Sequence, residues 1–202
     1  MRPNDRSVDQ KGRSFIETAR RAQIVEAAVD TLAELGYAKA SFARIAQRAG
    51  ISPGLISYHF RNKQELMEQV VTEVNADMER AIEERVEGAE GHVAVLRAVI
   101  EGFVHYCAAR PARLVAVGQI EGAEGWGAQE REQSIGDFEQ LLRSGQDDGE
   151  FRSFSSRLMA ATLLAALEAV PTELHARPDT DVRAYADELA TTFELAVRKV
   201  DH

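Results

Sequence analysis

Apolar residues recur at helical spacing along nearly the whole of this 202-residue chain. Steps of three and four residues place side chains on one face of a helix, whereas a half-buried strand alternates every second residue. No stretch of the sequence shows that alternation, and no internal repeat is present. The sequence therefore predicts an all-α protein.

Capping and turn residues divide the chain into helices. We expect residues 1–13 to form a disordered tail, because Ser14 and Glu17 match the S-x-x-E capping box that starts a helix. Gly36 is expected to end this first helix. The same kinds of signal predict further helices near residues 42–49, 53–60, 63–88, 92–109, 112–121, 127–145, 155–175 and 179–200.

Residues 41–60, SFARIAQRAGISPGLISYHF, contain the most specific pattern. Ser41 and Ser52 stand where they can cap two short helices, and Pro53 occupies the first position of the second, where a missing N–H costs nothing. Gly50 lies between the helices and can adopt the left-handed backbone of a tight turn. A small core would hold the pair together: Ile45, Ala46, Ala49, Ile51 and Ile56.

This arrangement is a helix-turn-helix, in which the second helix enters the major groove of DNA. Gly54 adds no bulk near the start of that helix, so the backbone and a phosphate can approach closely. Tyr58 and His59 supply polar donors, and Lys63 supplies a positive charge one turn further on.

The charge distribution agrees with a DNA-binding N-terminal part. Residues 1–63 carry 11 Lys and Arg against 6 Asp and Glu, a local charge of +5, although the whole chain has a net charge of −9. The remaining residues are therefore strongly acidic. A basic N-terminal part, residues 1–63, attached to an acidic remainder is suited to bind a polyanion through the N-terminal part only.

The stretch from Ile24 to Leu66 resembles the DNA-binding domain of the TetR family of repressors. The matching residues include Gly36-Tyr37, Ile45-Ala46, Ala49-Gly50-Ile51-Ser52, Tyr58-His59-Phe60 and Asn62-Lys63-Gln64-Glu65-Leu66. The resemblance implies that the residues facing DNA are Ser41, Arg44, Ser52, Pro53, Gly54, Leu55, Ser57, Tyr58, His59 and Lys63.

This chain departs from the commonest pattern of the family at two of these positions. Leu55 stands where a small polar residue is frequent, and Ser57 stands where a tyrosine is frequent. The two departures leave the base preference open.

The resemblance also implies a domain organisation and a set of partners. Residues 14–62 would form a three-helix helix-turn-helix domain, and residues 63–202 a larger helical domain for effector binding and dimerisation. The expected partners are double-stranded operator DNA with an inverted repeat, a small-molecule effector of unknown identity, and a second copy of the chain.

The last two predicted helices carry the candidate dimer interface. The apolar positions of the last helix follow the steps of four and three that are typical of a coiled-coil seam, and the preceding helix carries an apolar stripe. The candidate interface residues are Met159, Leu163, Val170, Val182, Leu189, Phe193 and Val200. The alternative is an ordinary stripe that faces the core of the same chain.

The helices between residues 92 and 145 are the candidate effector site, because they combine aromatic and aliphatic residues with a few polar ones. The candidate ligand-binding residues are Phe103, Tyr106, Leu114, Glu121, Trp126 and Phe138. The alternative is that these residues only fill the core.

Other kinds of function find little support. Gly50 to Gly54 match the G-x-S-x-G motif of hydrolases, but no strand precedes them and Pro53 lacks the N–H that an oxyanion hole needs. The histidines show no ligand spacing with Cys107 or the carboxylates, so we expect no metal and no cofactor. Cys107, with alanines and a tyrosine around it, is expected to be a packed core thiol.

The longest apolar run, Leu158 to Leu167, is too short to cross a bilayer, and the N-terminus has no apolar signal segment. We therefore expect a cytoplasmic protein.

Taken with the helix-turn-helix pattern and the family resemblance, these features predict a non-enzymatic, ligand-responsive transcription regulator that acts as a repressor. The alternatives are an architectural protein that binds DNA without sequence preference and, as the weakest, a hydrolase.

Overall fold

The computed structural model describes the backbone of residues 5–199 and the side chains of residues 16–199. The described residues form helices throughout, and they contain no β-strand, only an isolated antiparallel bridge between Phe151 and Arg198. The prediction of an all-α protein is confirmed. Among the described helices, none combines the length and apolar character needed to cross a bilayer.

The chain divides into two compact units. The first contains the residues up to Glu73 together with Val115–Ala123, and the second contains Val74–Leu114 together with the residues from Glu124 onward. The sequence placed a domain boundary after residue 62, whereas the first part of the fourth helix belongs to the first compact unit. Its residues Leu66, Met67 and Val70 are completely buried.

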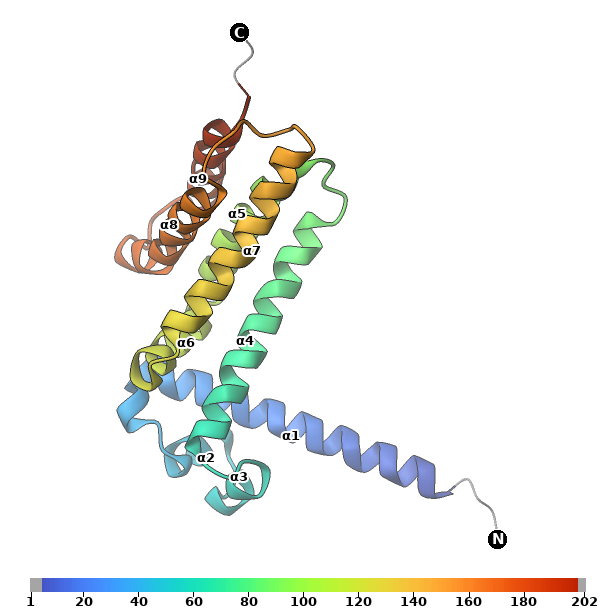
Figure 1. The fold of residues 1–202 in the computed structure, drawn as a ribbon. Coiled ribbons are helices and arrows are strands. Elements are labelled where there is room, and N and C mark those ends of the chain that lie inside the picture. Colours follow the sequence, from blue (N-terminus) through green and yellow to red (C-terminus); the bar gives the residue numbers. More distant parts are fainter. Residues whose placement is uncertain (1–4, 200–202) are drawn as a thin grey trace. The chain divides into compact units, whose positions relative to one another are not determined.

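The first unit contains the N-terminal helices (Figure 1). They are α1 (Asp5–Leu35), the short 3₁₀ helix η1 (Tyr37–Lys39), α2 (Phe42–Ala49), α3 (Pro53–His59), the first part of α4 (Lys63–Val86) and the middle of α6 (Pro111–Glu124). Helix α1 begins at Asp5, so the helix start predicted at Ser14 is wrong and residues 5–13 do not form a disordered tail. Residues 1–4 lie outside the described residues.

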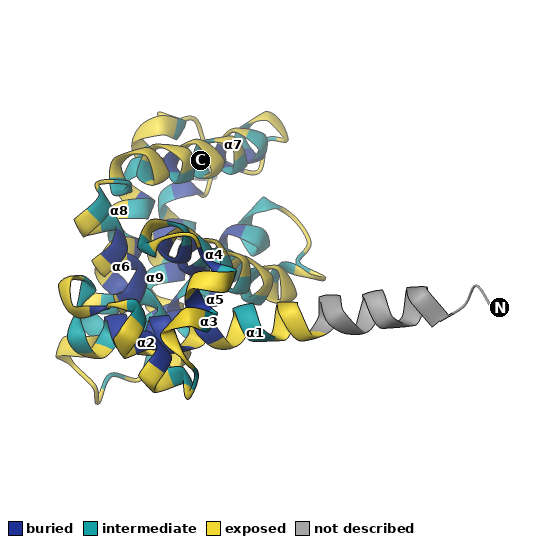
Figure 2. Cartoon of the chain, turned by 90° about the horizontal axis from the view of Figure 1, so that it is seen from below, coloured by how far each residue is buried: buried dark blue, intermediate teal, exposed yellow. Residues whose placement is uncertain are grey.

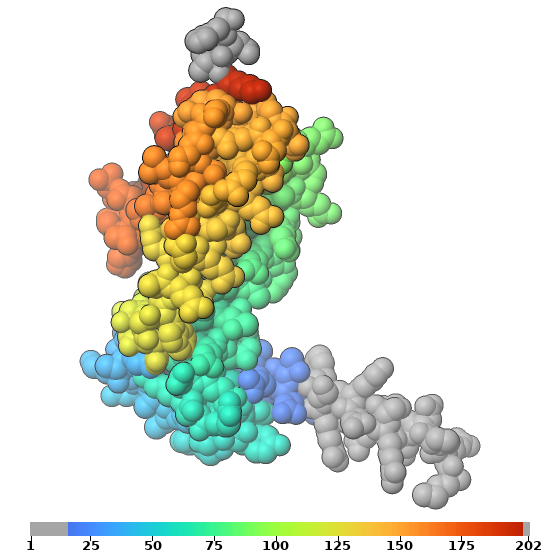
Figure 3. All heavy atoms as spheres, viewed as in Figure 1, coloured from blue at the N-terminus to red at the C-terminus, as the bar shows by residue number. Residues whose placement is uncertain are grey.

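The second unit is a bundle in which α5 packs against three other helices. It contains the rest of α4, both ends of α6, α5 (His92–Ala109), α7 (Gly127–Asp147), α8 (Ser156–Ala176) and α9 (Val182–Val197). Helix α5 contacts α7, α8 and α9, and α7 also lies along α8. Helix α7, drawn yellow to orange, forms much of the face that the second unit turns to the viewer in Figure 3.

The core of the second unit is aliphatic and aromatic. Its main cluster includes the fully buried residues Ile100, Leu142 and Leu163. Cys107 is 3% exposed and belongs to a second cluster, where burial raises the pKa of its thiol to about 12. The prediction of a packed core thiol is confirmed.

Candidate nucleic-acid interface

The local structure of α2 and α3 follows from three short-range signals. The Ser41 hydroxyl accepts a hydrogen bond from the Arg44 N–H at 3.4 Å, and the Ser52 hydroxyl accepts one from the Leu55 N–H at 3.3 Å. Gly50 has a φ of +67°, the left-handed conformation that a side chain disfavours. The two predicted caps and the predicted turn are confirmed, and Ser52 has the capping role in place of a nucleophilic one.

Buried residues fix the angle between these two helices. Ile45, Ala46 and Ile56 are completely buried, and the Ile51 N–H donates to the Ala46 carbonyl at 3.0 Å. Ala49 lies at the edge of this cluster and is half-buried. The core predicted for the pair is therefore present, with its centre at the three fully buried residues.

The side of α2 and α3 away from this core is exposed and mostly polar. Figure 2 shows yellow, exposed residues beside dark-blue, buried ones along both helices. The exposed residues among those predicted to face DNA are Ser41, Arg44, Ser52, Pro53, Gly54, Ser57 and Tyr58. Leu55 is half-buried and offers only part of its side chain.

Tyr58 and His59 end the second helix as a pair of rings. Tyr58 is 77% exposed, and its ring meets the His59 ring edge to face with 5.1 Å between centroids. Nδ1 of His59 is buried and has no hydrogen-bond partner among the described residues. A hydrogen bond from this imidazole to DNA would therefore involve Nε2.

Two basic residues hold this part of the unit together. The Lys63 ammonium donates to the Tyr37 carbonyl at 2.6 Å and lies 3.7 Å from the centre of the Tyr37 ring. The Arg21 guanidinium donates to the His59 carbonyl at 2.7 Å and stacks on Phe60. Sequence reasoning assigned Lys63 to a phosphate only and did not identify Arg21, because both contacts join residues more than 25 positions apart.

Helix α6 supplies a further contact within the first unit. The Tyr37 N–H donates to Oε1 of Gln119 at 3.3 Å, so the 3₁₀ turn that precedes α2 is bonded to α6. Gln119 was not among the predicted functional residues. Its partner is 82 positions away, and no local pattern in the sequence indicates it.

The six predicted ligand-binding residues are divided between the two compact units. Tyr106 is 3% exposed, and its hydroxyl lies 3.1 Å from the Asp77 carboxylate. Burial, followed by the Asp77 charge, raises the pKa of Tyr106 to about 12. Glu121 belongs to the first unit and the other five residues belong to the second.

The remaining candidates have packing roles in the second unit. Phe103, Leu114 and Phe138 pack against its two buried clusters, and Trp126 precedes the first residue of α7. None of the six predicted residues lines the pocket of the second unit described below. For Phe103, Leu114, Phe138 and Tyr106, core packing accounts for the observed contacts.

Most residues of the predicted dimer interface are buried or half-buried within the single chain. Leu163 and Val170 are completely buried and Phe193 is 6% exposed within the single chain, so these side chains have little surface to offer a partner. Met159, Val182 and Leu189 are half-buried and pack against the same clusters. Val200 lies outside the described residues.

A different stripe of α8 is exposed. Leu158 is 68% exposed, and Thr162, Ala165, Ala169 and Thr172 follow it on the same helix face at steps of four and three. Leu195 on α9 is 62% exposed. Small and apolar residues on an exposed helix face permit close approach of another helix.

Comparison with known proteins agrees with this geometry. Residues 24–70 match the family described as bacterial regulatory proteins, tetR family. The chain is 36% identical over 88 residues to the HTH-type transcriptional regulator BetI 1 of Chromohalobacter salexigens, and the match covers 43% of this chain and 44% of that protein. A BetI regulator of Escherichia coli is 33% identical over 82 residues, which cover 42% of its length. The chain thus matches less than half of the length of these relatives.

Solved structures extend the fold comparison beyond the N-terminal part. A TetR-like transcriptional regulator from Rhodococcus sp. RHA1 matches with a TM-score of 0.72 at 24% identity, over 86% of this chain and 93% of that one. The fatty acid degradation regulator FadR from Bacillus halodurans matches with a TM-score of 0.73 at 22% identity, over 86% of this chain and 94% of its own. At these identities the similarity concerns the fold alone.

Proposed function

We propose that this chain, whose residues 24–70 match the tetR family of bacterial regulatory proteins, is a member of that family and a cytoplasmic transcription repressor that binds operator DNA through α2 and α3. The observation that carries the proposal is the exposed polar face of the capped α2–α3 pair, which includes Ser41, Arg44 and Tyr58. A helix-turn-helix of this form contacts phosphates with its caps and helix ends and reads bases with its second helix.

The operator is the first object to identify. The full chain is used to select binding sites from a pool of random double-stranded DNA. We expect the selection to enrich an inverted repeat, because the α2–α3 pairs of a symmetric dimer would read two equal half-sites. Footprinting of the selected DNA should show half-sites about one helical turn apart or slightly more. A pool that shows no enrichment over successive rounds would mean that the chain binds DNA without sequence preference.

Tyr58 provides a direct test of the docking surface. Replacing Tyr58 with Phe removes one hydroxyl from a side chain that is 77% exposed, so folding should be unaffected. Loss of a hydrogen bond to a phosphate should weaken operator binding by roughly 1–3 kcal/mol, or about 5- to 150-fold, measured by fluorescence anisotropy at fixed salt.

The matched control is Tyr185→Phe on α9, in the second unit. It removes the same hydroxyl and should leave operator affinity unchanged. If Tyr58→Phe binds the operator as tightly as the wild type, the Tyr58 hydroxyl does not contact DNA.

We further propose that the protein is a homodimer held by the exposed stripe of α8 and the neighbouring surface of α9. The stripe follows the 4-3 spacing of a helix-helix seam and includes Leu158, Ala165 and Ala169. This assignment replaces the buried residues in the interface predicted from sequence, and it keeps the same two helices.

Ala165 is the central position for testing the dimer. Ala165→Glu places a charge in the middle of the seam, where it would be buried without a partner in the dimer but remain solvated in the monomer. Sedimentation equilibrium should show twice the chain mass for the wild type and the single-chain mass for the variant at micromolar concentration. Ala128→Glu, at an exposed position of α7, should stay dimeric. A dimeric Ala165→Glu would place the interface elsewhere.

We propose that an effector binds the second unit and releases DNA. Helices α4 and α6 each have residues in both compact units, so a change in the second unit can reach the first along the backbone of either helix. An effector can shift the equilibrium only by its differential affinity for the two states. The effector must therefore bind the free repressor more tightly than it binds the repressor–DNA complex. The ratio of these two affinities equals the factor by which the effector weakens DNA binding.

A further inference from the structure

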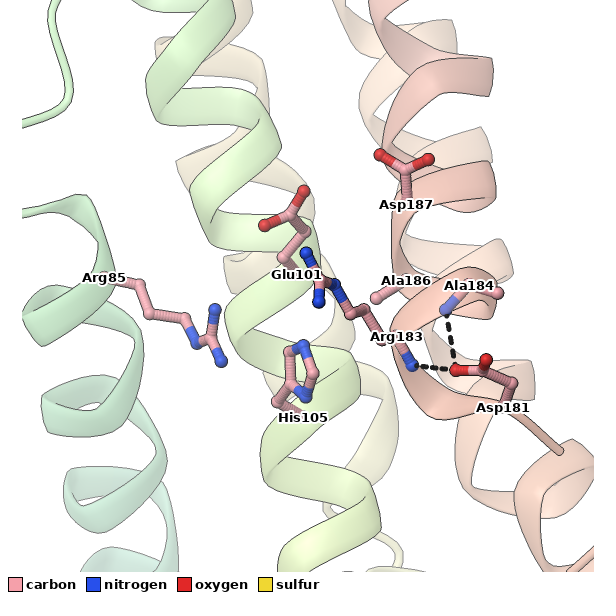
Figure 4. A pocket seen from close by; sticks show the side chains of 8 residues that line it. All are labelled: Arg85, Glu101, His105, Asp181, Arg183, Ala184, Ala186 and Asp187. Carbon is pink, nitrogen blue, oxygen red and sulfur yellow. Dashed lines mark hydrogen bonds between the residues drawn. The ribbon is translucent and has the colours of Figure 1, made fainter. Parts of the chain in front are cut away.

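A pocket of about 740 Å³ lies in the second unit among α4, α5 and α9 (Figure 4). Its volume is within the range of cavities that hold small molecules. Arg85 comes from α4, Glu101 and His105 from α5, and Asp181 and Arg183 from the start of α9. The lining is thus mainly charged, unlike the aromatic site that the sequence predicted.

Gly102 allows α4 to approach α5 at this point. A Cβ atom on Gly102 would lie 3.2 Å from Cγ1 of Ile82 and 3.3 Å from Cδ of Arg85. The aliphatic stem of Arg85 therefore packs on the bare backbone of α5. Figure 4 shows the guanidinium group beyond this contact, turned toward His105.

The carboxylates around the pocket already have partners within the chain. The Arg97 guanidinium pairs with Glu101 at 3.0 Å and with Asp187 at 2.8 Å. The Asp181 carboxylate accepts hydrogen bonds from the backbone N–H groups of Arg183 and Ala184 at the start of α9. Among the described side chains, no group of three His, Cys, Asp or Glu residues is arranged to hold a metal ion.

The two arginine side chains of the pocket, unlike its carboxylates, have no charged partner within the described part of the chain. Within the described part of the chain, neither the Arg85 nor the Arg183 guanidinium forms an ion pair or a hydrogen bond. In Figure 4 the Arg85 guanidinium points toward His105 from α4, and the Arg183 guanidinium lies between His105 and Glu101. Two guanidinium groups that point into one pocket and lack an internal partner are suited to bind carboxylate or phosphate oxygens.

His105 lies close to both arginines and is sensitive to their charge. Burial, the charge of Arg85 and the charge of Arg183 lower the pKa of His105, while Glu101 acts in the opposite direction. The imidazole is therefore neutral at pH 7 and has one N–H to donate. An anion bound between the arginines would offset their charge and raise the pKa of His105.

We propose that this pocket binds a small organic anion, a carboxylate or a phosphate ester, whose oxygens are held by Arg85 and Arg183 with His105 as a further donor. Binding would connect α4 to α9, two helices that are far apart in the sequence. That the bound anion also acts as the effector rests on the regulatory function proposed above. Occupancy of the pocket does not depend on that function.

The test uses isothermal titration calorimetry on the full chain without DNA. Succinate and glycerol 3-phosphate are the probes, in sodium chloride at constant ionic strength. We expect at least one probe to bind with a Kd of roughly 1 mM or lower, and Arg85→Gln and Arg183→Gln each to weaken binding at least about 10-fold. Binding of succinate alone indicates carboxylate recognition, binding of glycerol 3-phosphate alone indicates phosphate recognition, and either result supports the site.

Matched variants distinguish binding of the probe at this pocket from a general effect of the protein's positive charge on anion binding. Arg80→Gln removes an equal charge from α4, at a residue paired with Asp77 outside the pocket, and should bind the probe like the wild type. Arg85→Lys keeps the charge and should retain part of the affinity, which shows that the fold persists. Nuclear magnetic resonance titration should show a rise in the pKa of His105 on addition of the probe.

Three results would overturn the proposal: no binding of either probe, an equal loss of affinity in Arg80→Gln, or a pKa of His105 that does not change on binding. Because these measurements contain no DNA, their failure leaves the DNA-binding proposal intact. Conversely, a chain that fails to bind an operator could still bind the probe.

Discussion

Replacing Gly54 with Glu is expected to abolish operator binding while leaving the protein folded. Gly54 is exposed in the first turn of α3, and a Cβ atom there would have only the Ser52 hydroxyl oxygen as a neighbour, at 4.0 Å. The new side chain therefore has space, and an acidic group in the first turn of a helix is mildly stabilising. In the complex the same carboxylate would meet the phosphates of DNA, and like charges in contact cost several kcal/mol.

We expect a loss of operator affinity of at least about 100-fold, measured by fluorescence anisotropy at fixed salt. Gly136→Glu is the matched control, because Gly136 is an exposed helical glycine of α7 with no atom within 4 Å of an added Cβ. Both variants have the same composition and net charge. Equal operator affinity in the two variants would show that the start of α3 does not face DNA.

Replacing Gly145 with Ala is expected to destabilise the second unit, although the same change in an exposed helix normally stabilises. A Cβ atom on Gly145 would overlap with Cδ2 and Cε2 of the Phe151 ring, which is 2% exposed. The Phe151 N–H also donates to the Gly145 carbonyl at 2.9 Å, so the ring cannot withdraw without disturbing that bond. Overpacking of this kind costs about 2–3 kcal/mol.

For a chain of this size, a loss of that magnitude lowers the Tm by roughly 5–10 °C in calorimetry. Gly136→Ala, in the same helix, removes backbone freedom without a clash and should raise the free energy of unfolding by about 0.5–1 kcal/mol. The two substitutions are chemically identical and should have opposite signs. A stabilising Gly145→Ala would mean that the Phe151 ring does not pack on this helix.

The helix-turn-helix could be predicted in detail because its signals are local. Ser41 and Ser52 cap helices within three residues of themselves, and Gly50 adopts the left-handed turn that its position requires. Each of these features depends on a few neighbouring residues. The structure therefore confirms the bounds of α2 exactly as predicted and those of α3 to within one residue.

The predicted dimer interface illustrates what helical spacing alone does not indicate, namely which chain buries an apolar helix face. The spacing of Leu163, Val170 and Phe193 correctly indicated buried helix faces, but these faces pack inside the same chain. A periodic stripe shows that a face is buried and does not show which chain buries it. Apart from Leu158, the exposed stripe that includes Ala165 consists of small residues, which give little hydrophobic signal in the sequence.

The pocket was missed for a similar reason. Its Arg85, His105 and Arg183 come from three helices, and their proximity depends on the packing of α4 on Gly102. Sequence reasoning favoured aromatic residues such as Phe103 and Phe138, which fill the core. Charged residues that lie up to 98 positions apart form no pattern that a single sequence can display.

The central claim is that the exposed face of α2 and α3 reads a DNA sequence. The most direct test compares the affinity of the full chain for the selected operator with its affinity for scrambled DNA of the same length and composition, at physiological salt. A sequence-specific repressor should bind the operator at least about 1,000-fold more tightly. Equal affinity for the two DNAs would contradict the claim and would identify an architectural DNA-binding protein instead.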